Sequence, residues 1–230
     1  MGFFRSANIV SRADKISNFT VSTAEYGSAV MEVLGTTRIS GNVIYYDDFT
    51  AHEHRETQRS GKGGGVKSTT ITYTYTAAVI MGLCEGPVRG IDRVWIDKEL
   101  YQYPSDKIGM TLYTGTADQQ PWPYVVGKHP KKALPYTGLA YMAGVNANLP
   151  NFNFEVQGKL TETGDGVDVN PADYIRYILD KIGLQDVEIA GLDNYRQYCQ
   201  EADFLISTPS DYTSAKTARD IVNEIVSLTN

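Results

Sequence analysis

One long stretch of alternating side chains constrains the fold of this chain more than any other feature. Between Val66 and Met81, the odd positions from 71 onward carry Ile, Tyr, Tyr, Ala, Val and Met, and the even positions 70 to 76 carry Thr. A period of two is typical of a β-strand with two different faces. Ala78 and Ile80 then make both faces apolar. The pattern predicts a long hairpin arm that begins half exposed and ends inside a core.

Shorter strands are predicted on either side of this arm. Turns at Glu85-Gly86-Pro87 and Arg89-Gly90 lead into a short apolar strand from Val94 to Ile96. The alternation of Phe152, Phe154 and Val156 with polar residues predicts a further strand. Residues 39–45 also alternate, and Gly41 is expected to kink or bulge that strand.

Two polar or proline-rich regions read as loops. Residues 47–65 are polar and end in a glycine cluster, which predicts a flexible loop or hairpin tip. Six prolines mark residues 103–150 as loop-like, with short strands expected only at Thr111–Tyr113 and Tyr124–Val126. The small apolar residues of 133–147 fit either a short helix or a wrapped segment.

The last third of the chain changes to helical patterns. Asn170-Pro171 combines an N-cap with a proline in the first helical position, and Gly183 is a natural stop. Within this helix we expect Tyr174, Ile178 and Leu179 to pack against the β part. A second helix is predicted from Leu192 to Ala202, and a third, capped by Thr213 or Ser214, up to Leu228. The predicted fold is therefore α+β and mainly β, with a β-rich domain over 1–165 and a helical segment over 166–230.

The charge distribution and the cysteines exclude several classes of protein. The net charge is −6, and residues 136–230 hold 6 basic against 14 acidic side chains, which disfavours binding to nucleic-acid phosphates. Cys84 and Cys199 both lie in apolar patterns and are expected to be buried free thiols, although a disulfide between them stays open. The longest uncharged apolar run, Ala77–Cys84, is far too short to span a membrane. We therefore expect a soluble protein made in a reducing cytoplasm.

Two motifs resemble ligand sites but lack essential parts. His52 and His54 would share one face of a strand, yet no third metal ligand with a recognised spacing is nearby. The segment Ser60–Gly65 resembles a phosphate loop, but position 56 is Glu where that loop needs Gly, and a strand follows it in place of a helix. A solvated polar loop is the expected interpretation of the two histidines, and a flexible hairpin tip is the expected interpretation of Ser60–Gly65.

The remaining candidates for chemistry are pairs of acids and a group of tyrosines. Asp47-Asp48, and Asp165 with Asp168, are carboxylate pairs, but neither belongs to a complete calcium loop. The tyrosines at 73, 75, 101 and 103 could form a stacking platform for sugars or bases, although strand packing or a subunit interface is the favoured interpretation. The sequence therefore predicts no catalytic residue, no metal site and no cofactor, and the protein is not expected to be an enzyme.

Four blocks together resemble the tail-hub proteins of long-tailed bacteriophages and the hub of gene transfer agents. They occur in the order of that family: Tyr26-Gly27 with residues 35–45, residues 83–91 with Trp95, residues 149–156, and Asn170-Pro171-Ala172. The block LCEGPVRGI at 83–91 is the most specific of them. At position 45 this chain has Tyr where Trp is common in the family.

The resemblance implies a structural part of a tail tip or baseplate hub, with a tube-like antiparallel β domain. It implies a trimer that caps the tail tube, meets the distal tail protein, supports host attachment and DNA passage, and is assembled in the bacterial cytoplasm for the virion tail. The 230-residue chain would be the N-terminal portion of a longer hub. In that family Gly86 and Gly90 would permit backbone angles that other residues resist. Two alternatives stay open: a stand-alone carbohydrate-binding β domain and a cell-wall-cleaving tail module.

Overall fold

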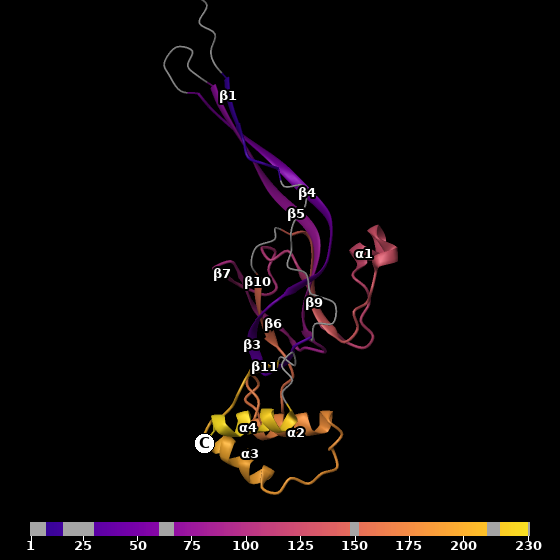
Figure 1. Ribbon diagram of the computed structural model, residues 1–230, viewed down its shortest axis with the longest axis vertical. Helices are drawn as coiled ribbons and strands as arrows, with labels where there is room; N and C mark the ends of the chain where they lie inside the picture. Colours follow the sequence, from indigo (N-terminus) through magenta and orange to yellow (C-terminus); the bar gives the residue numbers. More distant parts are fainter. Residues whose placement is uncertain (1–7, 16–29, 60–66, 148–151, 211–216, 230) are drawn as a thin grey trace, which may run out of the picture.

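The fold consists of a β body with an arm of strands at one end and helices at the other (Figure 1). The computed structural model describes residues 8–15, 30–59, 67–147, 152–210 and 217–229. The described strands form three sheets of five, four and two strands, and most strand pairs are antiparallel. This confirms the predicted mainly β fold with helices near the C-terminus.

The five-stranded sheet is built around one long strand, β5 (Lys67–Glu85). On one side β5 pairs with β4 (Asn42–Arg59) in antiparallel fashion. On its other side it pairs with β1 (Asn8–Arg12), which runs parallel to it, and then with β9 (Leu139–Ala147), to which β8 (Thr111–Tyr113) is added. The long predicted strand is confirmed and continues beyond Met81.

The four-stranded sheet has the order β3 (Thr36–Ser40), β10 (Phe152–Gln157), β6 (Gly90–Ile96) and β7 (Glu99–Gln102), all antiparallel. It contains the strands predicted around Val94 and from Phe152 to Val156. The small third sheet joins β2 (Glu32–Leu34) to β11 (Thr208–Ser210). The expected break at Gly41 is also present, because β3 ends one residue before it and β4 begins one residue after it.

Two different layers bury the two faces of β5 at its base. Val79 and Met81 point into a core that they share with Phe154 and Val94 of the four-stranded sheet. The opposite face, with Ile80, packs in a second cluster that includes Trp122, Val125 and Tyr141. This explains why the strand pattern changes from alternating to continuously apolar at Ala77.

Three helices form a separate cluster at the end opposite the arm (Figure 1). They are α2 (Pro171–Lys181), α3 (Leu192–Glu201) and α4 (Ala218–Leu228). The Asn170 side chain accepts a hydrogen bond from the Ala172 amide at 2.9 Å, which confirms the predicted cap. Tyr174 and Ile178 are buried as expected, but their cluster consists mainly of other helical residues, with Leu34 as the contact from a strand.

The prediction of a flexible loop or hairpin tip was wrong for residues 47–59. They form the outer half of β4, which stays paired with β5 as far as Arg59 opposite Lys67. The side chains from His52 to Arg59 are all exposed, so this part of the strand needs no apolar alternation and the sequence carried no signal for it. The predicted tip at 60–65 lies outside the described residues.

Two further predictions in the proline-rich region were wrong. The strand expected at Tyr124–Val126 is α1 (Pro123–Lys128), which begins with a proline at its first position and is followed by the short 3₁₀ helix η1 (Pro130–Lys132). The segment 133–147 was expected to be a short helix or a wrapped segment, but Leu139–Ala147 forms the strand β9. β9 lies between two strands, and its buried central residues Ala140–Gly144 face packed layers on both sides, which obscures any alternation.

The cap of α4 and the role of the turn glycines also differ from expectation. Thr217 caps α4 and forms a reciprocal capping box with Asp220, whereas Thr213 and Ser214 lie outside the described residues. Gly86 and Gly90 do not adopt left-handed backbone angles. Gly86 is required for a different reason: a Cβ there would lie 2.6 Å from the Cα of Gly115, so two backbones pass too closely for any side chain.

Candidate assembly surface

The most exposed regular structure is the arm, which we define as residues 8–12, 50–59 and 67–76. β4 and β5 pair without a register shift from Thr50 opposite Thr76 to Arg59 opposite Lys67, and β1 lies on the other side of β5. In Figure 1 the arm projects away from the body, with no other described element over it. Among the described residues, the arm therefore has two strand edges without a partner strand, and Ile71 is its buried side chain.

One face of the arm carries an aromatic stripe. Phe49, one residue before the arm, stacks on Tyr75 with ring centroids 5.4 Å apart, and the ring of Tyr75 lies 6.4 Å from that of Tyr73. Glu53 organises the polar part of this face, because it accepts a hydrogen bond from Tyr73 at 3.0 Å and lies 3.7 Å from Arg12. Hydrogen bonds, first from the neighbouring arginine Arg55 and then from Tyr73, lower the pKa of Glu53. Half-buried aromatic rings with satisfied polar groups are typical of surfaces that bind other proteins.

The opposite face carries threonines and the two neighbouring histidines. Nε2 of His52 lies 2.8 Å from the hydroxyl of Thr76, and Nε2 of His54 lies 2.8 Å from that of Thr74. The two histidines do share a strand face, but each ring is engaged with a threonine of β5. Among the described residues neither belongs to a group that could hold a metal ion.

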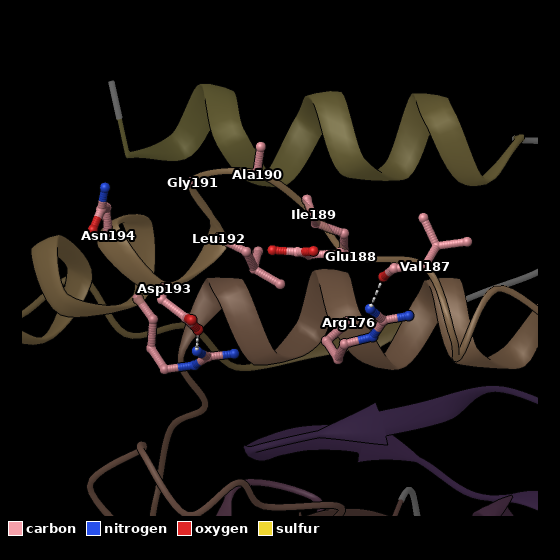
Figure 2. A pocket seen from close by; sticks show the side chains of 10 residues that line it. Arg176, Val187, Glu188, Ile189, Ala190, Gly191, Leu192, Asp193 and Asn194 are labelled. Atoms are coloured by element: carbon pink, nitrogen blue, oxygen red, sulfur yellow. Dashed lines mark hydrogen bonds and ion pairs between the residues drawn. The ribbon is translucent and has the colours of Figure 1, made fainter.

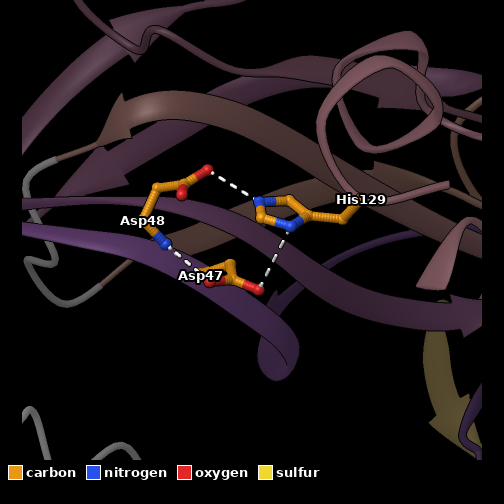
Figure 3. A group of neighbouring side chains, drawn as sticks. All are labelled: Asp47, Asp48 and His129. Atoms are coloured by element: carbon orange, nitrogen blue, oxygen red, sulfur yellow. Dashed lines mark hydrogen bonds and ion pairs between the residues drawn. The ribbon is translucent and has the colours of Figure 1, made fainter. Parts of the chain in front are cut away.

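The base of the arm is held by a network that the sequence did not reveal (Figure 3). Asp48 accepts hydrogen bonds from Tyr124 at 2.5 Å and shares a contact of 3.0 Å with Nε2 of His129. Asp47 accepts a hydrogen bond from Nζ of Lys132 at 2.6 Å. The pKa of Asp47 is lowered chiefly by Lys132, and the pKa of Asp48 chiefly by Tyr124 and then His129.

This network attaches α1 and η1 to a bulge of β4. Asp48 has a left-handed backbone, with φ of 53°, within the register shift between Asp47 and Thr50. Two carboxylates and an imidazole within 4.8 Å are possible metal ligands. However, a lysine ammonium and a tyrosine hydroxyl already bind the same oxygens, so the arrangement acts as a clamp. The carboxylate pair was noted in the sequence, but its partners lie about eighty residues away, beyond any local signal.

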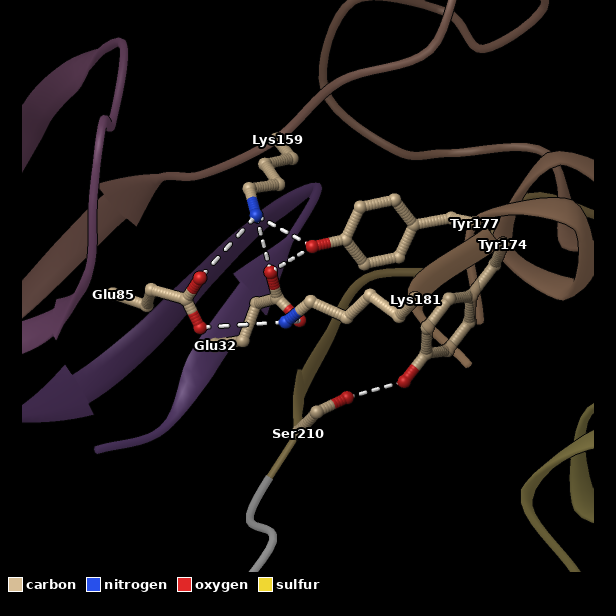
Figure 4. Close-up of polar contacts among 7 residues, drawn as sticks. All are labelled: Glu32, Glu85, Lys159, Tyr174, Tyr177, Lys181 and Ser210. Atoms are coloured by element: carbon tan, nitrogen blue, oxygen red, sulfur yellow. Dashed lines mark hydrogen bonds and ion pairs between the residues drawn. The ribbon is translucent and has the colours of Figure 1, made fainter. Parts of the chain in front are cut away.

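A second polar cluster joins the β body to α2 (Figure 4). The carboxylate of Glu32 is fully buried and accepts hydrogen bonds from Lys159, from Tyr177 and, at 2.9 Å, from Lys181. Lys181 also lies 3.3 Å from Glu85 at the end of β5. Burial lowers the pKa of Lys159, but hydrogen bonds with Glu32 and Tyr177 outweigh it, so that the pKa is raised. The cluster is a structural junction, and nothing in the sequence pattern marked it.

A pocket of about 410 Å³ lies between α2, the chain that follows it and the start of α3 (Figure 2). Two arginines line it, but both are engaged. Arg176 donates to the Val187 carbonyl at 2.8 Å and to Asp180 at 2.8 Å, and Arg196 donates to Asp173 at 2.7 Å and to Asp193. These guanidinium groups hold the helices and their connection in place.

The other candidates from the sequence do not form a common site. Asp165 accepts hydrogen bonds from the backbone amides of Val167 and Asp168, which lower its pKa and close a local turn. Tyr101 lies on β7, in a different sheet from Tyr73 and Tyr75, so the four tyrosines do not line a single strand face.

Both cysteines are buried free thiols, as predicted. Burial raises the pKa of Cys84 to about 12 and also raises that of Cys199, so both remain protonated and unreactive at neutral pH. No helix in the described part of the chain is long and apolar enough to cross a bilayer.

Comparison with known proteins shows a similarity in fold. Neither the protein-family models nor the curated protein sequences contain a match to this chain. Among solved structures, the fold is similar to a chain described as "Virion of native gene transfer agent (GTA) particle", with a TM-score of 0.60 and 19% sequence identity. The likeness covers 90% of this chain and 50% of the other, so this chain spans about half the length of that protein.

Proposed function

We propose that this chain is a structural component of a phage-type virion, located at the tail tip or baseplate hub. The observation that carries the proposal is the similarity of nine-tenths of the chain to a chain of a gene transfer agent virion particle. The proposed role is to cap the tail tube and to support host attachment and DNA passage. Residues 1–165 would form the hub domain, and residues 166–230 would form a helical unit attached to it through Glu32.

The chemistry of the described side chains supports a structural role over an enzymatic one. The carboxylates at the base of the arm bind Lys132 and Tyr124, and the arm histidines contact threonines. The two thiols are buried and protonated. In the described part of the chain, no third group is bonded to either histidine ring, and a working nucleophile–base pair needs such an orienting group.

The proposed partners are other copies of this chain, in a ring of three, and the distal tail protein of the same virion. The arm supports assembly because it exposes two faces and two strand edges that no described element covers. Long uncovered strands readily pair with other chains. The protein would be assembled in the bacterial cytoplasm and function in the virion tail.

The proposal can be tested on the complete protein by light scattering and electron microscopy. We expect a ring at the concentrations of tail assembly, and we expect Tyr73→Glu with Tyr75→Glu to weaken it by placing charges on the aromatic stripe. Thr72→Glu with Thr74→Glu is the matched control, because these residues lie on the opposite face of the same strand. A monomer at those concentrations would contradict the proposal.

A second test is made in the virion. Deleting the gene from the genome that encodes the particle is expected to give particles without a functional tail tip, and complementation is expected to restore it. Normal infectious particles after deletion would overturn the structural role. Binding of a cell-wall glycan by the isolated monomer, lost in the Tyr73 and Tyr75 variant, would instead support a carbohydrate-binding domain.

A further inference from the structure

The arm has two free strand edges, and they run in opposite directions. β5 is the central strand of the arm, with β4 on one side and β1 on the other. β4 is antiparallel to β5, and β1 is parallel to it, so β1 and β4 are antiparallel to each other. Within the described residues, neither β1 nor β4 has a partner strand on its outer side.

The β4 edge is regular enough to serve as a template for pairing. The register shifts of β4 lie between Val43 and Tyr45 and between Asp47 and Thr50, at the base. From Thr50 to Arg59 the strand continues without a bulge, and it contains no proline. Of the usual protections of an edge strand, this segment has charged side chains, at Glu53, Arg55, Glu56 and Arg59, but it has no bulge, no proline and no short length.

The β1 edge has an additional reason to be covered. Ile9 and Val10 are 56% and 62% exposed, although they lie on opposite faces of the strand. A strand with large apolar side chains exposed on both faces is stabilised when a further strand extends the sheet beside it.

We infer that β1 of one copy of this chain pairs with β4 of the next copy, in antiparallel orientation, and that repetition of this contact closes a ring of arms. The inference rests on the proposed assembly, in which all arms point the same way. In such an assembly two β4 edges could meet only as parallel strands, whereas β1 and β4 meet as antiparallel strands, the more stable arrangement. A head-to-tail contact between two different edges repeats from copy to copy, since each copy offers one of each, and it closes into a ring when the rotation between copies returns to the first one.

The pairing predicts which side chains share a face. Val10 lies level with Thr69, and Thr69 lies level with Thr57, so these three residues are on one face of the arm. When the sheet continues into the next copy, Val10 must lie beside an odd-numbered residue of β4, such as Arg55 or Thr57. Even-numbered residues such as Gln58 point to the opposite face, whatever the stagger between the copies.

Disulfide cross-linking can test this arrangement, because a bridge within one chain can be distinguished from a bridge between two chains. Within one copy, the central strand separates Val10 from Thr57 by two strand spacings, about 9.5 Å. A disulfide needs Cα atoms within about 7 Å, so any bridge between these positions must join two chains. The native Cys84 and Cys199 are buried and give little background.

The experiment uses the complete protein with Val10→Cys combined in turn with Arg55→Cys, Thr57→Cys, Glu56→Cys or Gln58→Cys. Under mild oxidation, we expect covalent oligomers with Arg55→Cys or Thr57→Cys, and a loss of cross-linking with the two even-numbered positions. Mixing the single variants Val10→Cys and Thr57→Cys should give only dimers that contain one chain of each. Circular dichroism and the size of the reduced protein confirm that each variant folds and assembles.

Three results would overturn the inference. Dimers of Thr57→Cys alone would show β4 against β4, and equal yields at odd and even positions would show no ordered pairing. A ring seen by electron microscopy without a cross-link from Val10→Cys to cysteine at any odd-numbered position from 51 to 59 would refute the edge contact but leave the proposed role intact. Conversely, specific cross-links in a protein whose deletion leaves infectious particles would refute the role and leave the pairing intact.

Discussion

The two halves of β5 belong to one strand but are stabilised in different ways. From Ala77 to Cys84 every residue is buried, because the four-stranded sheet covers one face and the α1 region covers the other. From Lys67 to Thr76 only Ile71 is buried, and the strand is held by its neighbours β4 and β1. The base therefore contributes to the stability of the monomer, whereas the arm is available for contacts between chains.

The largest difference between the two halves of β5 is expected when the same charge is introduced into each of them. Val79 is fully buried, and Val79→Asp would bury a charge without a partner, so we expect a loss of more than about 4 kcal/mol in the free energy of unfolding. Thr74 is exposed, and Thr74→Asp is expected to cost less than about 1 kcal/mol. Urea denaturation followed by circular dichroism measures both. Equal losses at the two positions would show that the arm is covered in the monomer.

The next largest difference in stability is expected between a buried carboxylate of the β body and an exposed carboxylate of the arm. Glu32 is buried among Lys159, Lys181 and Tyr177, whereas Glu53 forms its contacts on the exposed arm. Replacing both lysines by Met would leave a buried carboxylate without a cation and is expected to cost about 3 to 5 kcal/mol.

The matched test uses the same substitution at both carboxylates. Glu32→Gln is expected to cost less than the lysine pair, about 2 kcal/mol, because the two lysines are partly exposed and can turn toward water. Glu53→Gln is expected to leave the urea midpoint unchanged, since exposed ion pairs contribute little. A large shift for Glu53→Gln, or none for Glu32→Gln, would contradict the division between arm and base.

The sequence predicted β5 and the start of α2 better than the outer half of β4 or the polar clusters. Alternation from Ile71 to Met81 located β5, and Asn170-Pro171 located the start of α2, because these signals are local. The outer half of β4 carried no apolar pattern, since the side chains from His52 to Arg59 are exposed on both of its faces. Contacts such as Asp48 with His129, or Glu32 with Lys181, join residues that are far apart in the chain, and single-residue patterns contain no information about them.

The junction between arm and base should respond to acid. The pKa values of Asp47 and Asp48 are lowered in the folded protein, so their contribution to stability is complete above the unfolded pKa of about 3.9. It is lost as the pH falls through their lower folded pKa values. We expect the urea midpoint to decrease when the pH is lowered below about 4. In the double variant Asp47→Asn with Asp48→Asn, this decrease should be smaller. An unchanged pH profile in the double variant would show that the clamp adds no stability.

The smallest expected difference in stability between base and arm comes from removing a tyrosine hydroxyl in each, and at the base the substitution is expected to stabilise the protein. Tyr141 at the base is fully buried, and its hydroxyl has no hydrogen-bond partner among the described residues. Its ring stacks on Tyr113 at 4.5 Å and meets Tyr136 edge-on at 5.7 Å, contacts that phenylalanine keeps. Because an unpaired buried hydroxyl is destabilising, Tyr141→Phe is expected to raise the free energy of unfolding by about 1 kcal/mol.

The arm supplies the control for this last prediction. The hydroxyl of Tyr73 donates to Glu53 at 3.0 Å on a solvent-exposed surface, so Tyr73→Phe exchanges that bond for hydration of the carboxylate and should leave the urea midpoint unchanged. Thermal and urea denaturation of both variants measure the difference. A loss of stability in Tyr141→Phe would show that a water molecule or a neighbouring group satisfies the hydroxyl. In that case the base would hold a buried polar contact at the point where β9 meets α1, and its rigidity would depend on more than apolar packing.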